Sequence, residues 1–155
     1  MLLERNDVNP GCRDKSRRTP LSWAAEEGRE KIVKMLFNWG NINPDTNDEC
    51  GRTPLSYAAG PGFLSRGNQE GRERVVKILI ERNGVDPDHA DKSAQTPLSW
   101  AAMNWHENIV RMLLERDDVN PDTTDNNGRT PLSWAIGPGV ELKPKKSVRR
   151  LQIYC

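Results

Sequence analysis

Four copies of the tetrapeptide Thr-Pro-Leu-Ser dominate this sequence. They begin at Thr19, Thr53, Thr96 and Thr130, so that successive copies lie 34, 43 and 34 residues apart. Two further markers keep the same spacing: an (Asn/Asp)-Pro pair that begins at residues 9, 43, 86 and 120, and an aspartate at residues 14, 48, 91 and 125. A period of this length indicates a stack of similar supersecondary units, each of which buries its apolar face only against its neighbours.

The longer middle spacing contains an insertion of nine residues. The glutamates at 30, 73 and 107 lie 43 and then 34 residues apart, which places the extra residues between Thr53 and Glu73. The loop-forming stretch 60–68 is the natural candidate because it is rich in Gly and Pro. It is either a loop that touches a partner, with Phe63 and Leu64 at its tip, or a tolerated spacer, and the sequence favours neither interpretation.

Each unit predicts two short helices. Thr19 suits the N-cap of the first helix, and Pro20 suits its first position, where no backbone N–H is needed. In the second helix of this unit we expect Ile32, Val33 and Leu36 to turn inward. Helices this short are not stable alone, so the units must stack.

Charge and composition exclude several classes of protein. The 23 basic and 22 acidic side chains give a net charge of +1, which argues against binding to nucleic acid. No apolar run is long enough for a membrane span, so no membrane insertion is expected. The three cysteines are far apart, which favours a reducing compartment, the cytoplasm or the nucleus.

The sequence contains no recognisable catalytic motif. The only histidines, His89 and His106, have no metal-ligand partner at a suitable spacing. Phosphate-binding, dinucleotide-binding and nucleophile-elbow motifs are absent from the chain. We therefore expect no catalytic residue, no cofactor and no metal, and we do not expect an enzyme.

The segments 51–59, Gly-Arg-Thr-Pro-Leu-Ser-Tyr-Ala-Ala, and 128–135, Gly-Arg-Thr-Pro-Leu-Ser-Trp-Ala, resemble the ankyrin repeat pattern Gly-x-Thr-Pro-Leu-His-x-Ala-Ala. The resemblance covers nearly the whole chain. The sequence is similar to the long ankyrin arrays of filamentous fungi, which often follow a nucleotide-binding signalling domain. It implies an all-α solenoid of helix-turn-helix units joined by hairpin-like loops.

The resemblance divides the chain into a partial unit 1–18, full units 19–52, 53–95 and 96–129, and a degenerate last unit or cap 130–155. Residues 1–3 align with residues 35–37, so we expect a piece of a longer array. Two departures from the family pattern stand out. The family's His is Ser in every unit, and the Gly before the second helix, expected at Gly28 and Gly71, is Trp105 in the third unit, which costs about 1–2 kcal/mol if the backbone there is left-handed.

The family's usual role implies noncatalytic binding of a protein partner through the concave face and the loop tips, by a monomer. The alternative is a structural fragment of a larger ankyrin-array signalling protein that has no partner of its own. The candidates at the tips vary between units: they are Lys15, Arg18, Glu49, Arg52, Lys92, Gln95, Asn126 and Arg129. The candidates on the helix face are Glu26, Glu27, Met103 and Asn104.

One aromatic residue recurs in each unit. Trp23, Tyr57, Trp100 and Trp134 follow the inward Leu by two positions and should form a ladder along the array. The ladder is either packing between units or a stripe that touches a partner, since aromatic side chains often dominate interfaces.

Overall fold

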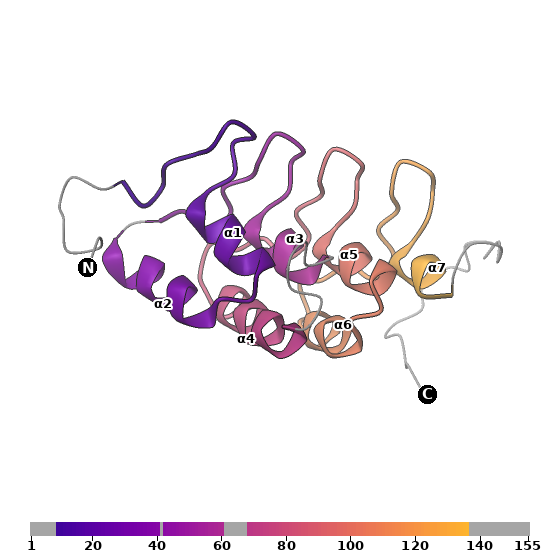
Figure 1. Ribbon diagram of the computed structural model, residues 1–155. Coiled ribbons are helices and arrows are strands. Elements are labelled where there is room, and N and C mark those ends of the chain that lie inside the picture. The colour runs from indigo at the N-terminus through magenta and orange to yellow at the C-terminus, as the bar shows by residue number, and fades with distance from the viewer. Residues whose placement is uncertain (1–8, 41, 61–67, 137–155) are drawn as a thin grey trace.

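The computed structural model describes residues 9–40, 42–60 and 68–136, and within them the chain forms seven helices and no strand. The helices are α1 (Pro20–Glu26), α2 (Glu30–Trp39), α3 (Pro54–Ala59), α4 (Gln69–Ile80), α5 (Pro97–Met103), α6 (Glu107–Leu114) and α7 (Pro131–Ile136). The first helices of the units form one layer, and α2, α4 and α6 form a second layer beneath it (Figure 1). This arrangement confirms the predicted all-α solenoid.

The first helix of each unit begins in the same way. The Thr19 hydroxyl accepts a hydrogen bond from the backbone N–H of Ser22 at 3.2 Å, and Thr53, Thr96 and Thr130 do the same for the Ser three residues on. The Ser22 hydroxyl lies 3.1 Å from the Thr19 hydroxyl. The Ser that replaces the family's His therefore bonds within its own unit.

The core lies between the two layers. Leu21, Leu55 and Leu98 of the first helices are at most 1% exposed, and the second helices contribute Val33, Val75, Val76, Leu79, Ile109 and Leu113, each 0% exposed. Within each layer a helix packs against the corresponding helix of the next unit. Burial of these side chains is the main favourable term in folding.

Ile32 departs from expectation. It was predicted to point inward, but it is 47% exposed, whereas Val75 and Ile109, which occupy the same position in the next two units, are fully buried. The reason is its place in the stack, because α2 is the first described second helix.

The insertion lengthens α4. This helix begins at Gln69, one turn before Glu73, the position that matches the starts of α2 and α6. Gly71 therefore lies inside α4, and the expectation that it precedes the helix is wrong; most of the proposed insertion 60–68 lies outside the described residues. Gly28 has the expected left-handed backbone, with φ +63°. A Cβ at Gly28 would lie 2.6 Å from the backbone N of Arg72, so the added turn packs closely on the first unit.

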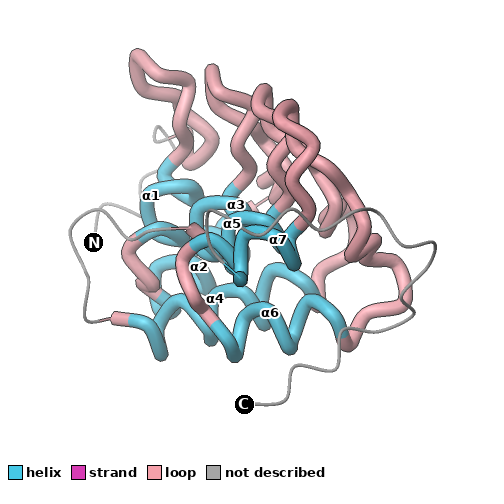
Figure 2. Tube along the Cα trace, turned by 90° about the vertical axis from the view of Figure 1, so that its right-hand side faces the viewer, coloured by secondary structure: helices cyan, strands magenta, loops and turns pink. Residues whose placement is uncertain are grey.

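The loops before the first helices, which we call the fingers, span residues 9–18, 43–52, 86–95 and 120–129. In the folded stack each finger is counted with the helices that follow it, so Arg18 belongs to the first unit, Arg52 to the second and Gln95 to the third. They project from one side of the stack (Figures 1 and 2). Backbone bonds join neighbouring fingers: the N–H of Glu49 donates to the carbonyl of Ser16 (3.1 Å), Lys92 to Cys50 (2.9 Å) and Asn126 to Ser93 (3.0 Å).

Candidate functional site

One aspartate shapes each finger and also holds an aromatic side chain of the following helix. In the second finger, Asp48 Oδ1 accepts hydrogen bonds from the backbone N–H groups of Cys50 and Arg52, both at 2.8 Å. Its Oδ2 accepts one from the Tyr57 hydroxyl at 2.6 Å. Burial, together with this bond, raises the pKa of Tyr57, so the phenol stays protonated and donates.

The same arrangement recurs in the other units with indole as the donor. Nε1 of Trp23, Trp100 and Trp134 donates to the aspartate nine residues earlier at 3.1, 3.1 and 3.2 Å. The repeated Asp found in the sequence is therefore the residue that fixes the position of each ring.

Arginine side chains fill the spaces between the rings. We call Trp23, Tyr57, Trp100 and Trp134 the aromatic row. The Arg18 guanidinium lies 3.5 Å from the Trp23 ring centre and 4.1 Å from that of Tyr57. Arg52 lies 4.2 Å from the ring centre of Trp100 and 6.0 Å from that of Tyr57. Such cation–π contacts are attractive, so rings and cations together tie unit to unit.

The row is incomplete in the third unit and at its ends. Gln95 occupies the position of Arg18 and Arg52, so no described guanidinium lies between Trp100 and Trp134. Arg129 lies over Trp134 alone, at 4.6 Å. Of the two interpretations of the aromatic series, packing between units is the one that these contacts favour.

Four of the candidate residues are largely buried. Glu26, Tyr57, Gln95 and Trp100 are each at most 9% exposed. Glu26 forms an ion pair with Arg18, which is itself half-buried between its two rings, and Arg52 is half-buried in the same way. These side chains are packed within the stack and offer little surface to a partner.

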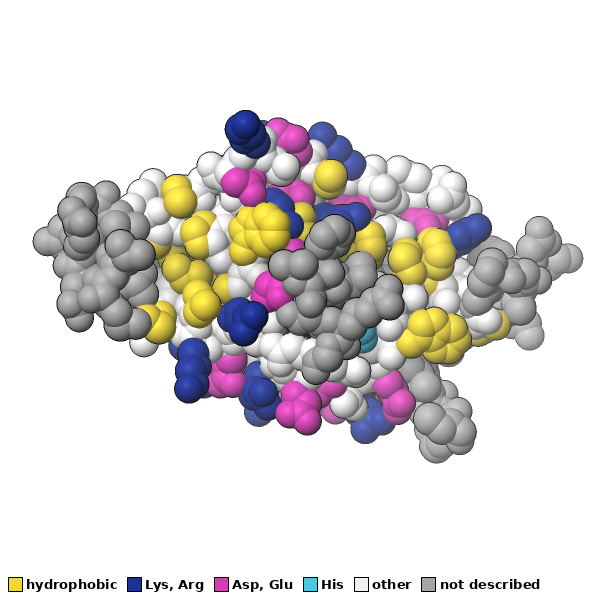
Figure 3. Space-filling view, in the orientation of Figure 1, with side chains coloured by type: hydrophobic (Ala, Val, Ile, Leu, Met, Phe, Trp, Pro, Cys, Tyr) yellow, Lys and Arg dark blue, Asp and Glu magenta, His cyan; other side chains and the backbone are white. Residues whose placement is uncertain are grey.

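The remaining candidates are accessible to different degrees. Trp23 is 42% exposed, and the finger residues Lys15, Glu49, Lys92, Asn126 and Arg129 are exposed as well. The half-buried candidates are Glu27, Met103, Asn104 and Trp134. Figure 3 shows hydrophobic side chains in a band across the face that carries the first helices, with charged side chains above and below it.

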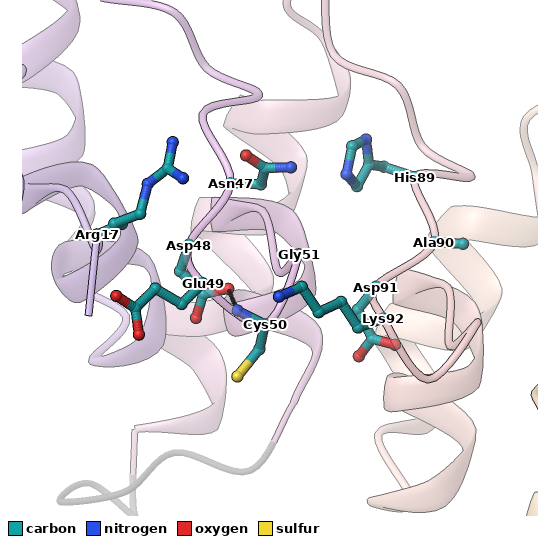
Figure 4. A pocket seen from close by; sticks show the side chains of 10 residues that line it. All are labelled: Arg17, Asn47, Asp48, Glu49, Cys50, Gly51, His89, Ala90, Asp91 and Lys92. Atoms are coloured by element: carbon teal, nitrogen blue, oxygen red, sulfur yellow. Dashed lines mark hydrogen bonds between the residues drawn. The ribbon is translucent and has the colours of Figure 1, made fainter.

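An open hollow lies between the second and third fingers. Its volume is about 750 Å³, and Arg17, Glu49 and Lys92, from three successive fingers, contribute to its lining (Figure 4). Its wall mixes both signs of charge, with Asp48 and Asp91 engaged in their fingers. Over the ranges that the structure describes, no group of three or more His, Cys, Asp or Glu side chains is placed to hold a metal ion.

Trp105 is not one of the candidate residues that the sequence pattern indicated. Trp105 is 70% exposed and its backbone is left-handed, with φ +59°. Gly28 occupies the same position in the first unit with nearly the same φ. The signal was visible in the sequence, where Trp replaces a Gly of the repeat pattern, but it indicated only a backbone cost.

A buried polar cluster joins the second and third units beside Trp105. Arg72, which is 3% exposed, donates through Nη1 to the Gly60 carbonyl at 2.6 Å, and His106 Nε2 lies 3.2 Å from the same oxygen. Burial lowers the pKa of His106, and the nearby charge of Arg72 adds to the effect. His106 is therefore neutral at pH 7 and donates its Nε2 proton to the carbonyl.

None of the described helices has the length and apolar character needed to cross a membrane.

Comparison with known protein families agrees with this geometry. A search of curated proteins found no match. A family model described as ankyrin repeats (3 copies) matches residues 1–66 and 64–142, which is most of the chain. Together with the stacked helix pairs and their fingers, this match shows that the chain belongs to the ankyrin repeat family.

Proposed function

We propose that this chain binds a protein partner, without catalysing a reaction, through the face formed by the first helices and the fingers. Ankyrin repeats are generally protein–protein interaction modules. The framework supports the proposal because the same hydrogen bonds recur in every unit, and a rigid surface loses little entropy on binding. The finger tips differ: the first carries Arg13, Lys15 and Arg17, the second Glu49, and the fourth two Asn residues.

Trp105 is the observation that carries the proposal. A left-handed backbone costs a non-glycine residue about 1–2 kcal/mol, and an exposed indole contributes little to the core. Folding alone favours Gly at this position, as in the first unit. Large aromatic side chains are frequent hot spots of interfaces, so binding accounts for a residue that folding does not favour.

The test compares two glycine variants. Trp105→Gly and Ala94→Gly each relieve a left-handed non-glycine residue, since Ala94 has φ +57°. Both variants should raise the free energy of unfolding, by roughly 1 kcal/mol. A partner isolated with the wild-type chain should bind Trp105→Gly at least roughly tenfold more weakly by calorimetry, although this variant, like Ala94→Gly, should be more stable than wild type. Equal binding by wild type and Trp105→Gly would remove Trp105 from the site and with it the main support of the proposal.

Three further proposals accompany this function. We place the chain inside the cell, in the cytoplasm or the nucleus, where ankyrin repeat proteins are often found. We assign the unit boundaries 1–18, 19–52, 53–95, 96–129 and 130–155. We assign no cofactor to the chain.

A further inference from the structure

The two ends of the described stack carry complementary halves of the contact that joins neighbouring units. Trp23 is 42% exposed, whereas Tyr57 and Trp100, in the same position, are 9% and 8% exposed. The difference has a specific cause. An arginine from the preceding unit covers Tyr57 and Trp100, and no described arginine covers the corresponding side of Trp23.

The other end carries the missing cation. Arg129 has the position of Arg18 and Arg52, and it is exposed over the Trp134 ring. Arg18 and Arg52 each reach a ring in the following unit, at 4.1 and 4.2 Å. Arg129 has no such second ring among the described residues. The Trp23 side chain of a second copy, placed where the next unit would begin, would supply that ring.

The finger backbone shows the same complementarity. In each bond between fingers, a backbone N–H donates to a carbonyl of the finger before it, as Glu49 does to Ser16 and Lys92 to Cys50. Lys15 has the donor position in the first finger, and its N–H has no acceptor in the described part of the chain. Asn127 has the acceptor position in the last finger.

A third pair of complementary groups lies at the bases of the fingers, where a carboxylate accepts a hydrogen bond from a backbone N–H of the next finger. Asp45 Oδ2 accepts from the backbone N–H of Asp86 at 2.7 Å, and Asp88 Oδ2 accepts from Asn120 at 2.7 Å. The next acceptor in this series is Asp122, which is exposed at the last finger. Its counterpart at the first end is the N–H of Asn9.

We infer that two copies of this chain associate head to tail, with the last finger and Arg129 of one copy against the first finger and Trp23 of the next. Three contacts of different chemistry share one register, so a single docking geometry satisfies a cation, an acceptor and a carboxylate together. The interface is heterologous, because different surfaces meet, and it therefore builds open chains or rings of copies rather than two-fold symmetric dimers. The residues named for these contacts all lie in the described part of the chain.

The experiment uses one variant at each end. Lys15→Pro removes the N–H donor and suits the turn, because the Arg17 N–H bonds to the Asp14 carbonyl and Pro is favoured at the second position of such turns. Arg129→Ala removes an exposed guanidinium. Sedimentation of the wild-type chain should show mass increasing with concentration over roughly 10 μM to 1 mM, the range of weak complexes. Each variant alone should associate at least roughly tenfold more weakly.

Mixing the variants gives the decisive result. Lys15→Pro retains Arg129, and Arg129→Ala retains the first finger, so an equal mixture should form one-to-one dimers that neither variant forms alone. Trp23→Ala provides a second block at the first end, and circular dichroism verifies the folding of every variant. A wild-type chain that stays monomeric overturns the inference, and so does an Arg129→Ala variant that self-associates normally or a mixture that does not pair. Because no outside partner enters this test, its failure leaves the proposed function untouched.

Discussion

Asp48 and Asp14 make corresponding hydrogen bonds in different surroundings. Each accepts two backbone N–H bonds in its finger and one bond from the aromatic side chain nine residues on. Asp48 is 8% exposed and its bond to Tyr57 is buried, whereas Asp14 is exposed. When a buried acceptor is removed, its donors cannot form replacement hydrogen bonds with water, so the free-energy cost of burying those donors is not offset.

We predict a larger loss for Asp48→Ala than for Asp14→Ala. The buried variant should lower the free energy of unfolding by roughly 2–4 kcal/mol, and the exposed one by about 1 kcal/mol or less. Urea unfolding of both variants, followed by circular dichroism, measures the difference. Equal losses would show that the shape of the finger, and not burial of the bond to the ring, determines the contribution of this aspartate.

At the level of the element, the contacts of the aromatic row predict how a substitution at Gln95 changes the free energy of unfolding. Gln95 interrupts the alternation of rings and cations, and it lies between Trp100 and Trp134 by register. Gln95→Arg should place a guanidinium there, with Asp125 as its counter-charge, as Asp91 is for Arg52 at 3.8 Å. The free energy of unfolding should rise by about 0.5–1 kcal/mol.

The reciprocal variant is the matched control. Arg52→Gln copies the third unit into the second and should lower the free energy of unfolding by a similar amount, about 0.5–1 kcal/mol. Both variants are measured by urea unfolding at low and high salt. A gain that vanishes with added salt would assign it to the pair with Asp125, and a loss of stability in Gln95→Arg would contradict the packing argument.

The elements also show what the sequence could predict. The starts of the first helices were predictable because Thr at the cap and Pro at the first position are local signals. The position of Ile32 was not, because its burial depends on a neighbouring unit and not on its own helix. Gly71 was misplaced because the extra turn of α4 depends on packing against Gly28. Pairing of Asp48 with Tyr57 was missed for a similar reason, since only the folded finger brings them together.

At the scale of the whole molecule, the units are coupled through groups that bridge them. His106 of the third unit and Arg72 of the second share the Gly60 carbonyl, in a cluster from which water is largely excluded. Because stacked units derive their stability from their interfaces, a change at this bridge should affect unfolding of the entire stack.

Protonation of His106 tests that coupling. Its pKa in the folded chain is lowered from the ordinary value of 6.5, first by burial and then by Arg72, so the unfolded chain takes up the proton more readily. The free energy of unfolding should therefore fall as the pH drops through about 6.5, and level off once the folded chain is also protonated. Urea midpoints between about pH 7.5 and about pH 5.5 measure this slope.

His106→Gln keeps an amide donor for the Gly60 carbonyl but cannot gain a charge, so its midpoints should vary much less over the same range. A single transition that shifts as one unit would show that proton uptake at one bridge is felt along the whole stack. Midpoints that stay constant in the wild-type chain would mean that the buried cluster accommodates a second positive charge beside Arg72, against the electrostatics on which the prediction rests.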